Sequence, residues 1–150
     1  MSALDAYINR VYRIIVLIIP AFCICASVTI TALHFLGFYE ELNETLLLLF
    51  DASDTLYLTI GIYFFYTGFG EDGIVLSEKL KAAKYTMAII LLIQWNEISY
   101  IWPFSDFWAY SVLFTIVEAF FFDVKLVAFS TAGIVISMFL SWHFNGDMLL

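Results

Sequence analysis

Five acidic or amide residues lie inside two stretches of chain that are otherwise suited to lipid: Asp51, Asp54, Gln94, Asn96 and Glu97. The two stretches are residues 46–69 and 85–104. An ionisable group at membrane depth costs about 2.5–3.5 kcal/mol on insertion scales, so it usually has a partner or a function. These residues are therefore the first candidates for a site that binds a ligand or an ion.

Helical spacing groups these residues. Asp51, Asp54 and Thr55 share one helical face at i, i+3 and i+4. Gln94 and Glu97 share another face at i and i+3. We expect one end of each span to face the exterior. At a rise of about 1.5 Å per residue, Asp51 and Asp54 lie roughly 9–14 Å below that end of their span, and Glu97 lies roughly 10 Å below that end of its own. The two groups therefore fall at matching depth.

Such a cluster predicts an acidic, water-accessible pocket open to the exterior, with His34 as a cap near the external end of the preceding span. No Lys or Arg lies deep in these stretches to neutralise it, so the carboxylates would share protons or bind a cation. Fitting ligands are a cationic small molecule, a peptide amine or protons. A metal ion is less favoured because no H-x-x-E type spacing occurs, and we expect neither a metal nor a cofactor.

A structural role competes with binding. In this alternative the carboxylates face water in the outer leaflet, or are protonated and hydrogen-bonded between helices. They would then only hold the helices together. The residues themselves leave both interpretations open.

The composition indicates which elements position these residues. The chain has 150 residues, of which 63% are hydrophobic and only 13% are charged. A soluble domain of this size would expose most of that apolar surface and aggregate. The sequence therefore predicts an all-α fold, a polytopic transmembrane helical bundle that forms one domain over residues 1–150.

Five apolar segments are predicted as spans, because about 20 apolar residues cross about 30 Å of hydrocarbon. They are residues 14–38, 45–69, 85–104, 107–122 and 126–144. Between the second and third spans, residues 70–84 mix apolar and basic side chains. This pattern predicts an amphipathic connector on the cytoplasmic membrane surface.

The basic residues indicate the orientation. If the five spans alternate, all six fall on one side: Arg10, Arg13, Lys79, Lys81, Lys84 and Lys125. By the positive-inside rule the N-terminus is cytoplasmic and the C-terminus is external. A protein that signals to the cytoplasm through its C-terminus would then need a sixth span, so we expect these residues to be a fragment.

Two segments give the chain a resemblance to a known family: residues 114–126, FTIVEAFFFDVKL, and residues 141–150, SWHFNGDMLL. The chain resembles the N-terminal multi-span sensor regions of bacterial diguanylate cyclases and, more loosely, of multi-span histidine kinases. The resemblance implies an input module in the bacterial cytoplasmic membrane that passes a signal on through helix shifts. The family's catalytic GGDEF motif is not among these residues, so no catalytic role carries over.

The leading hypothesis is thus a membrane-embedded sensory input module that lacks its cytoplasmic output domain. One alternative is a small transporter or channel subunit that uses the acidic cluster as a cation or proton site, and another is a structural membrane subunit. No nucleophile motif or phosphate loop occurs, so we expect no enzyme activity in this chain. Expected partners are the lipid bilayer, a cation or proton from the external side and a second copy of the chain, without nucleic acid.

Overall fold

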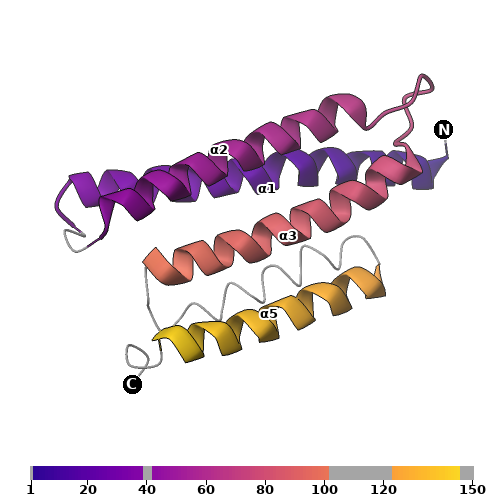
Figure 1. The fold of residues 1–150 in the computed structure, drawn as a ribbon. Helices are drawn as coiled ribbons and strands as arrows, with labels where there is room; N and C mark the ends of the chain where they lie inside the picture. Colours follow the sequence, from indigo (N-terminus) through magenta and orange to yellow (C-terminus); the bar gives the residue numbers. More distant parts are fainter. Residues whose placement is uncertain (1, 39–41, 102–122, 146–150) are drawn as a thin grey trace. The chain divides into compact units, whose positions relative to one another are not determined.

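The computed structural model describes residues 2–38, 42–101 and 123–145. These residues form four helices and no strand: α1 (Ala3–Phe35), α2 (Glu44–Thr67), α3 (Ser77–Ile101) and α5 (Val124–Asn145) (Figure 1). The prediction of an all-helical fold is confirmed for this part of the chain. The predicted fourth span, residues 107–122, lies outside the described residues.

The chain divides into two compact units, Met1–Met87 and Ala88–Leu150, with the boundary inside α3. The first unit contains α1, α2 and the beginning of α3. The second contains the rest of α3 and α5. The predicted site residues are shared between them, because the aspartates and the histidine belong to the first unit and Gln94, Asn96 and Glu97 to the second.

Helix α1 begins earlier than the predicted span, residues 14–38. Ser2 and Asp5 form a capping box, in which the Asp5 N–H donates to Ser2 Oγ (3.1 Å) and the Ser2 N–H donates to Asp5 Oδ2 (2.7 Å). The helix ends at Phe35, and Gly37 follows with a φ of 82°, a backbone conformation that glycine adopts readily. The helix therefore includes polar residues on the N-terminal side of the apolar run.

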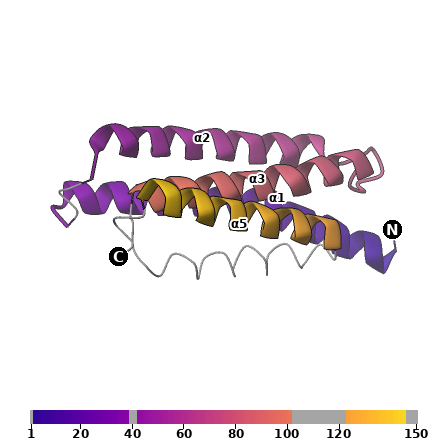
Figure 2. The ribbon, with the colours of Figure 1, turned by 60° about the horizontal axis from the view of Figure 1, so that its bottom comes forward.

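Helices α1 and α2 form an antiparallel hairpin and lie side by side (Figures 1 and 2). The side chain of Asn43 caps α2 by accepting hydrogen bonds from the N–H groups of Thr45 (2.9 Å) and Leu46 (3.3 Å). The buried residues of α2 recur every three or four positions and so form one face: Leu47, Phe50, Asp54, Tyr57, Gly61 and Phe64. This face includes one of the two predicted aspartates.

The backbones of the hairpin approach closely at Gly61. A Cβ atom there would lie 2.3 Å from the carbonyl oxygen of Val16 and 2.7 Å from Cγ of Pro20. Because Pro20 has no N–H, the Val16 carbonyl lacks its usual donor four residues later in the helix. The absence of a side chain at Gly61 thus allows α2 to pack against α1 at the carbonyl that Pro20 leaves without its usual donor.

The segment between α2 and α3 is fixed to the start of α1 by Asn9. The Asn9 Nδ2 donates to the carbonyl of Gly73 (2.8 Å), and the Asn9 Oδ1 accepts from the N–H of Val75 (3.0 Å). Phe69 and Val75 form an isolated antiparallel bridge, and Gly73 has a φ of 73°. The segment is therefore a tight, hydrogen-bonded turn.

A second contact at this end comes from Tyr12, whose hydroxyl donates to the carbonyl of Phe64 (2.8 Å). The Tyr12 ring also packs edge-on against the Phe69 ring, with 5.6 Å between the ring centres. A Cβ atom at Gly68 would lie 2.2 Å from the Tyr12 hydroxyl oxygen, so this position has no room for a side chain. Tyr12 thus joins the N-terminal part of α1 to the end of α2, as Asn9 joins it to the turn that follows.

The predicted connector, residues 70–84, differs from the structure. Only its first part is a turn, since α3 begins at Ser77 and continues without a break into the predicted third span, residues 85–104. The two glycines of the turn and its bonds to Asn9 allow this early start. Helix α5, capped by the side chain of Asp123, closely matches the predicted fifth span, residues 126–144.

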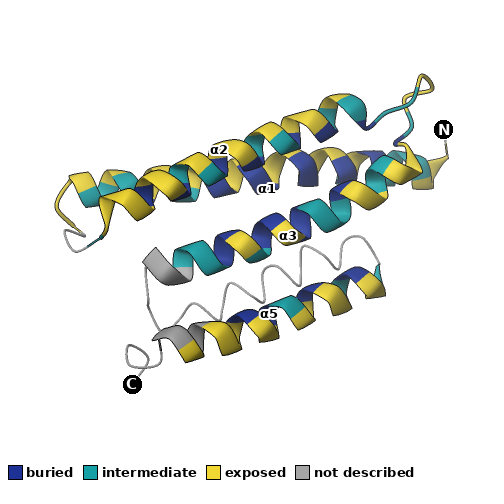
Figure 3. Cartoon of the chain, in the orientation of Figure 1, coloured by how far each residue is buried: buried dark blue, intermediate teal, exposed yellow. Residues whose placement is uncertain are grey.

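The first unit is apolar outside and partly polar inside. Figure 3 shows the buried side of α1 and α2 facing inward and a broad exposed side facing outward. Large exposed hydrophobic side chains recur along both helices: Ile14, Leu17, Ile18, Phe22, Val28, Phe35, Leu46, Leu48, Leu49, Leu56 and Ile62. By length and composition α1 and α2 could each cross a membrane, whereas the apolar part of α5, Val124–Leu140, is shorter.

Candidate functional site

Asp54 is completely buried, with 0% of its surface exposed. It lies on the face of α2 that packs against α1, between Phe50 and Tyr57, which are also buried. An ionised carboxylate in such a place needs hydrogen bonds or an opposite charge, because its desolvation costs several kcal/mol. Asp54 does interact with other groups of the protein. Among the predicted site residues, it is the most completely withdrawn from solvent.

Asp51, one turn earlier, is half-buried and bonded to α1. The hydroxyl of Thr31 lies 3.2 Å from Asp51 Oδ1 and 3.1 Å from Oδ2, and it donates to this carboxylate. Thr55, which was expected on the same face, is exposed, and its hydroxyl donates to the backbone carbonyl of Asp51 (2.9 Å). The carboxylate therefore has its partner in α1 rather than within α2.

The Thr31–Asp51 pair also indicates what lies across from Asp54. In an antiparallel hairpin, moving one turn along α2 corresponds to moving one turn back along α1. This register places Asp54 near the turn of α1 that contains residues 27 and 28, where Ser27 is buried and donates its hydroxyl to the carbonyl of Ile24 (3.1 Å). The hairpin thus has a polar stretch inside an apolar exterior.

Thr31 and Ser27 were not identified from the sequence as part of the site. A signal for them exists, because Ser27, Thr31 and His34 follow one another at i, i+4 and i+7 and so share a face of α1. His34 is half-buried in the last turn of α1, with its ring edge-on to that of Phe35 at 5.3 Å. Its role as a cap of the carboxylates stays a prediction.

In the second unit, Asn96 has a clear packing role. Its Nδ2 donates to the carbonyl of Leu92 (2.7 Å) and to Oγ of Ser137 in α5 (2.9 Å). A Cβ atom at Gly133 would lie 2.6 Å from Leu92 Cδ1, so the two helices are also close one turn away from this bond. Polar bonds next to small residues are typical of helix pairs in membranes. Asn96 therefore joins α3 to α5.

Gln94 and Glu97 lie on a different side of α3 from Asn96. Gln94 is only 2% exposed, Glu97 is half-buried, and both interact with other groups of the protein. They belong to the second unit, whereas the aspartates belong to the first. A common pocket of Asp51, Asp54, Gln94 and Glu97 therefore stays a prediction.

A double-mutant cycle tests the packing role of Asn96. Replacing Asn96 by Ala and Ser137 by Ala, singly and together, should reveal a coupling energy of about 0.6 kcal/mol and at most about 1.7 kcal/mol, the range found for hydrogen bonds between membrane helices. The measurement is the free energy of unfolding in mixed micelles. Strictly additive losses would contradict the bond between α3 and α5.

The described residues contain no group of three His, Cys, Asp or Glu side chains placed to hold a metal ion. Instead, the α1–α2 hairpin brings together two carboxyl groups, of Asp51 and Asp54, and the hydroxyl groups of Thr31 and Ser27 inside an apolar exterior. The resemblance to sensor regions of diguanylate cyclases stays a prediction. No family model, no curated protein and no solved structure matches the chain, so a functional proposal depends on these residues alone.

Proposed function

We propose that the chain is a multi-pass protein of a bacterial cytoplasmic membrane and serves as the sensory input module of a signalling protein. The observation that carries the membrane location is the inverted polarity of the α1–α2 hairpin. Asp54 is 0% exposed, whereas Ile18 is 59% and Leu48 is 69% exposed. Water would favour the opposite arrangement, and lipid favours this one.

The extent of burial supports the same conclusion. In the most apolar part of α1 only 39% of the residues are buried, and in that of α2 only 28%. A core helix of a soluble protein would have most of its apolar surface covered by other elements. Lipid chains can cover the remaining apolar surface of both helices.

The first unit also supports the proposed orientation. Asn9 is bonded to Gly73 and Val75, so the N-terminal part of α1 and the turn before α3 lie at the same end of the hairpin. Arg10 and Arg13 are therefore at the same end as Lys79. This agrees with a cytoplasmic location for all three and with an external location for the turn between α1 and α2.

The hairpin offers a way for a signal to be passed on. A proton or cation that binds at Asp51 or Asp54 would change the polar contacts between α1 and α2. The contacts of Asn9 and Tyr12 join both helices to the turn that leads into α3, so a small shift of the hairpin would reach α3. The five-span arrangement, with residues 107–122 as fourth span, completes the proposal.

Cysteine labelling tests the membrane location and orientation. In a background with Cys23→Ala and Cys25→Ala, the exposed residues Glu44 and Glu71 are replaced by Cys one at a time. A maleimide that cannot cross membranes should label Glu44→Cys in intact bacterial cells, but Glu71→Cys only after the cells are broken. Recovery of the chain in the soluble fraction, or equal labelling of both sites in intact cells, would contradict the proposal.

The coding sequence beyond Leu150 separates an input module from the transporter alternative. An input module requires that the reading frame continue through a further span into a cytoplasmic signalling domain. A stop codon at this point, together with cation or proton flux through proteoliposomes that contain the purified chain, would instead establish a transporter or channel subunit. A stop codon without flux would leave the structural subunit.

A further inference from the structure

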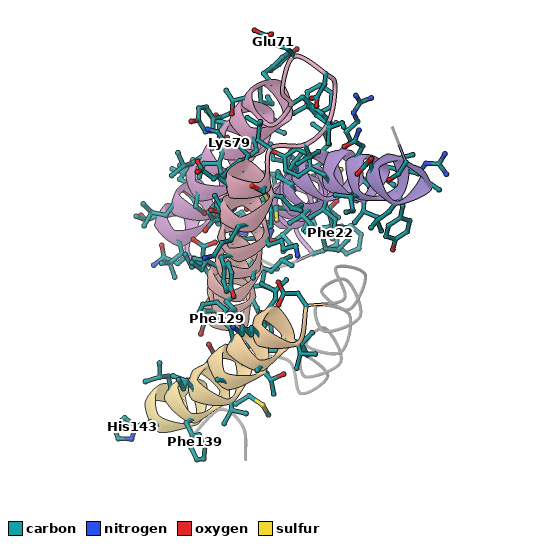
Figure 4. The ribbon with its side chains drawn as sticks, turned by 90° about the vertical axis from the view of Figure 1, so that its right-hand side faces the viewer. Phe22, Glu71, Lys79, Phe129, Phe139 and His143 are labelled. Carbon is teal, nitrogen blue, oxygen red and sulfur yellow. The ribbon has the colours of Figure 1, made fainter. Side chains whose placement is uncertain are left out.

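One end of the first unit carries four basic side chains without a carboxylate partner. Arg10 and Arg13 lie in α1, and Lys79 and Lys81 lie in α3. Within the part of the chain that the structure describes, none of the four forms an ion pair with Asp or Glu. We call these four residues the basic end; Figure 4 shows Lys79 there, with Glu71 at the tip of the neighbouring turn.

Two of these cations rest on aromatic rings. The guanidinium of Arg13 lies 4.6 Å from the centre of the Phe69 ring. The Lys79 ammonium donates to the hydroxyl of Tyr63 (2.9 Å) and lies 4.8 Å from the centre of its ring. Cation–π contacts restrain a charged group without neutralising it. Both groups therefore keep N–H donors for an anion from outside the protein.

The carboxylates nearby do not form ion pairs with these cations. Asp5 Oδ2 accepts the Ser2 N–H within the capping box, and Asp72 Oδ1 accepts the N–H of Ile74 within the turn. Glu71 and Glu78 are exposed, and neither pairs with a basic residue among the described residues. An anionic partner would therefore find unpaired positive charge at the basic end.

The surroundings of the basic end indicate the kind of anion. Tyr7, Tyr63 and Tyr66 are exposed there, as tyrosines of an interfacial belt are. On α1 the repeated exposed apolar side chains start at Ile14, directly after Arg13, and before that point only Leu4 and Tyr7 are large exposed hydrophobic residues. The basic side chains thus lie where apolar helix surface gives way to polar surface, which is the level of lipid phosphate groups in a membrane.

We propose that the basic end binds the phosphate groups of anionic phospholipids in the cytoplasmic leaflet. The inference rests on the membrane location proposed above and adds a lipid specificity to it. Arg13 and Lys79, which are held on aromatic rings, contact the headgroup directly. Arg10 and Lys81 add long-range attraction. Anionic lipid would thereby connect the start of α1 to the start of α3.

Thermal unfolding of the purified full chain in a neutral detergent tests the inference. Added phosphatidylglycerol should raise Tm more than the same amount of phosphatidylcholine, because a ligand of the folded state stabilises it. Raising NaCl from about 50 to about 500 mM should remove most of this difference by screening. Inorganic phosphate at the lipid concentration should not change Tm. Equal effects of the two lipids, or an equal effect of free phosphate, would overturn the inference.

Paired variants locate the lipid contact. Arg13→Gln with Lys79→Gln should weaken the phosphatidylglycerol effect by about 25-fold in apparent affinity, since each basic residue near an anionic surface contributes about fivefold. The control is Lys84→Gln with Lys125→Gln, which removes the same amount of charge outside the basic end. Lys84 already interacts within the protein, and Lys125 belongs to the second unit. An equal loss in both pairs would overturn the inference.

Two further comparisons make the result decisive. Arg13→Lys with Lys79→Arg keeps both charges and should keep the phosphatidylglycerol effect, which excludes misfolding as the cause of the loss. Each variant is compared with itself in phosphatidylcholine. If cysteine labelling shows a membrane protein but Tm does not depend on phosphatidylglycerol, this inference fails while the proposed function stands.

Discussion

Replacing Gly61 by Ala should destabilise the α1–α2 hairpin by about 1–3 kcal/mol, the usual cost of overpacking a close contact. The added Cβ would lie 2.3 Å from the Val16 carbonyl oxygen and 2.7 Å from Cγ of Pro20. A backbone oxygen and a proline ring cannot rotate away as a flexible side chain can. The helices must therefore separate, and this would also disturb the nearby contact of Tyr12 with Phe64. The measurement is the free energy of unfolding in mixed micelles.

Gly133→Ala is the matched control. Its Cβ would lie 2.6 Å from Cδ1 of Leu92, the end of a side chain that can adopt another rotamer. We expect a loss below about 1 kcal/mol, since the neighbour can move. If Gly61→Ala were as stable as the wild type, or if Gly133→Ala cost more, the close approach of α1 and α2 would be contradicted.

Local signals in the sequence predicted the helices but not all their ends. The apolar runs predicted both ends of α2 and α5, and the C-terminal end of α1, to within three residues. The early start of α1 was missed, although Ser2 and Asp5 have the spacing of a capping box. That signal lies outside the apolar run, and the span was predicted from apolar residues alone.

The turn before α3 was harder to predict, because its main contacts come from a distant residue. Asn9 bonds to Gly73 and Val75, 64 and 66 positions away in the chain. No local pattern shows such a contact. Without it, the basic and apolar residues of 77–84 look like a separate surface segment rather than the first turns of α3.

The candidate site was predicted in part. The sequence pattern identified Asp54 as an ionisable residue within an apolar helix, and the structure shows it to be completely buried. Thr31 as the partner of Asp51 was missed, because pairing between helices depends on their register, which the sequence does not show. Asn96, which was grouped with Gln94 and Glu97, instead bonds to Ser137 and joins two helices.

Asp54→Asn should separate a binding role of Asp54 from a structural one. Asn has nearly the same size and can keep hydrogen bonds, but it has no charge to hold a proton or a cation. If Asp54 binds a cation, the variant should bind it about 10- to 100-fold more weakly, since a hydrogen bond to a charged group contributes about 1.5–3 kcal/mol. Stability should be unchanged or higher, because a buried amide is desolvated at lower cost than a carboxylate.

The two readouts for this variant are the free energy of unfolding and its dependence on pH and on added small cations. The stability of the wild-type protein should change with pH or with added cations, and Asp54→Asn should lose that dependence. Only a group that exchanges protons or binds ions contributes to such linkage. Glu71→Gln is the matched control, because it removes one exposed carboxylate in the turn before α3. If Asp54→Asn, Asp51→Asn and Glu97→Gln all kept the wild-type response, and Asp54→Asn lost stability, then Asp54 would serve only to hold α1 and α2 together.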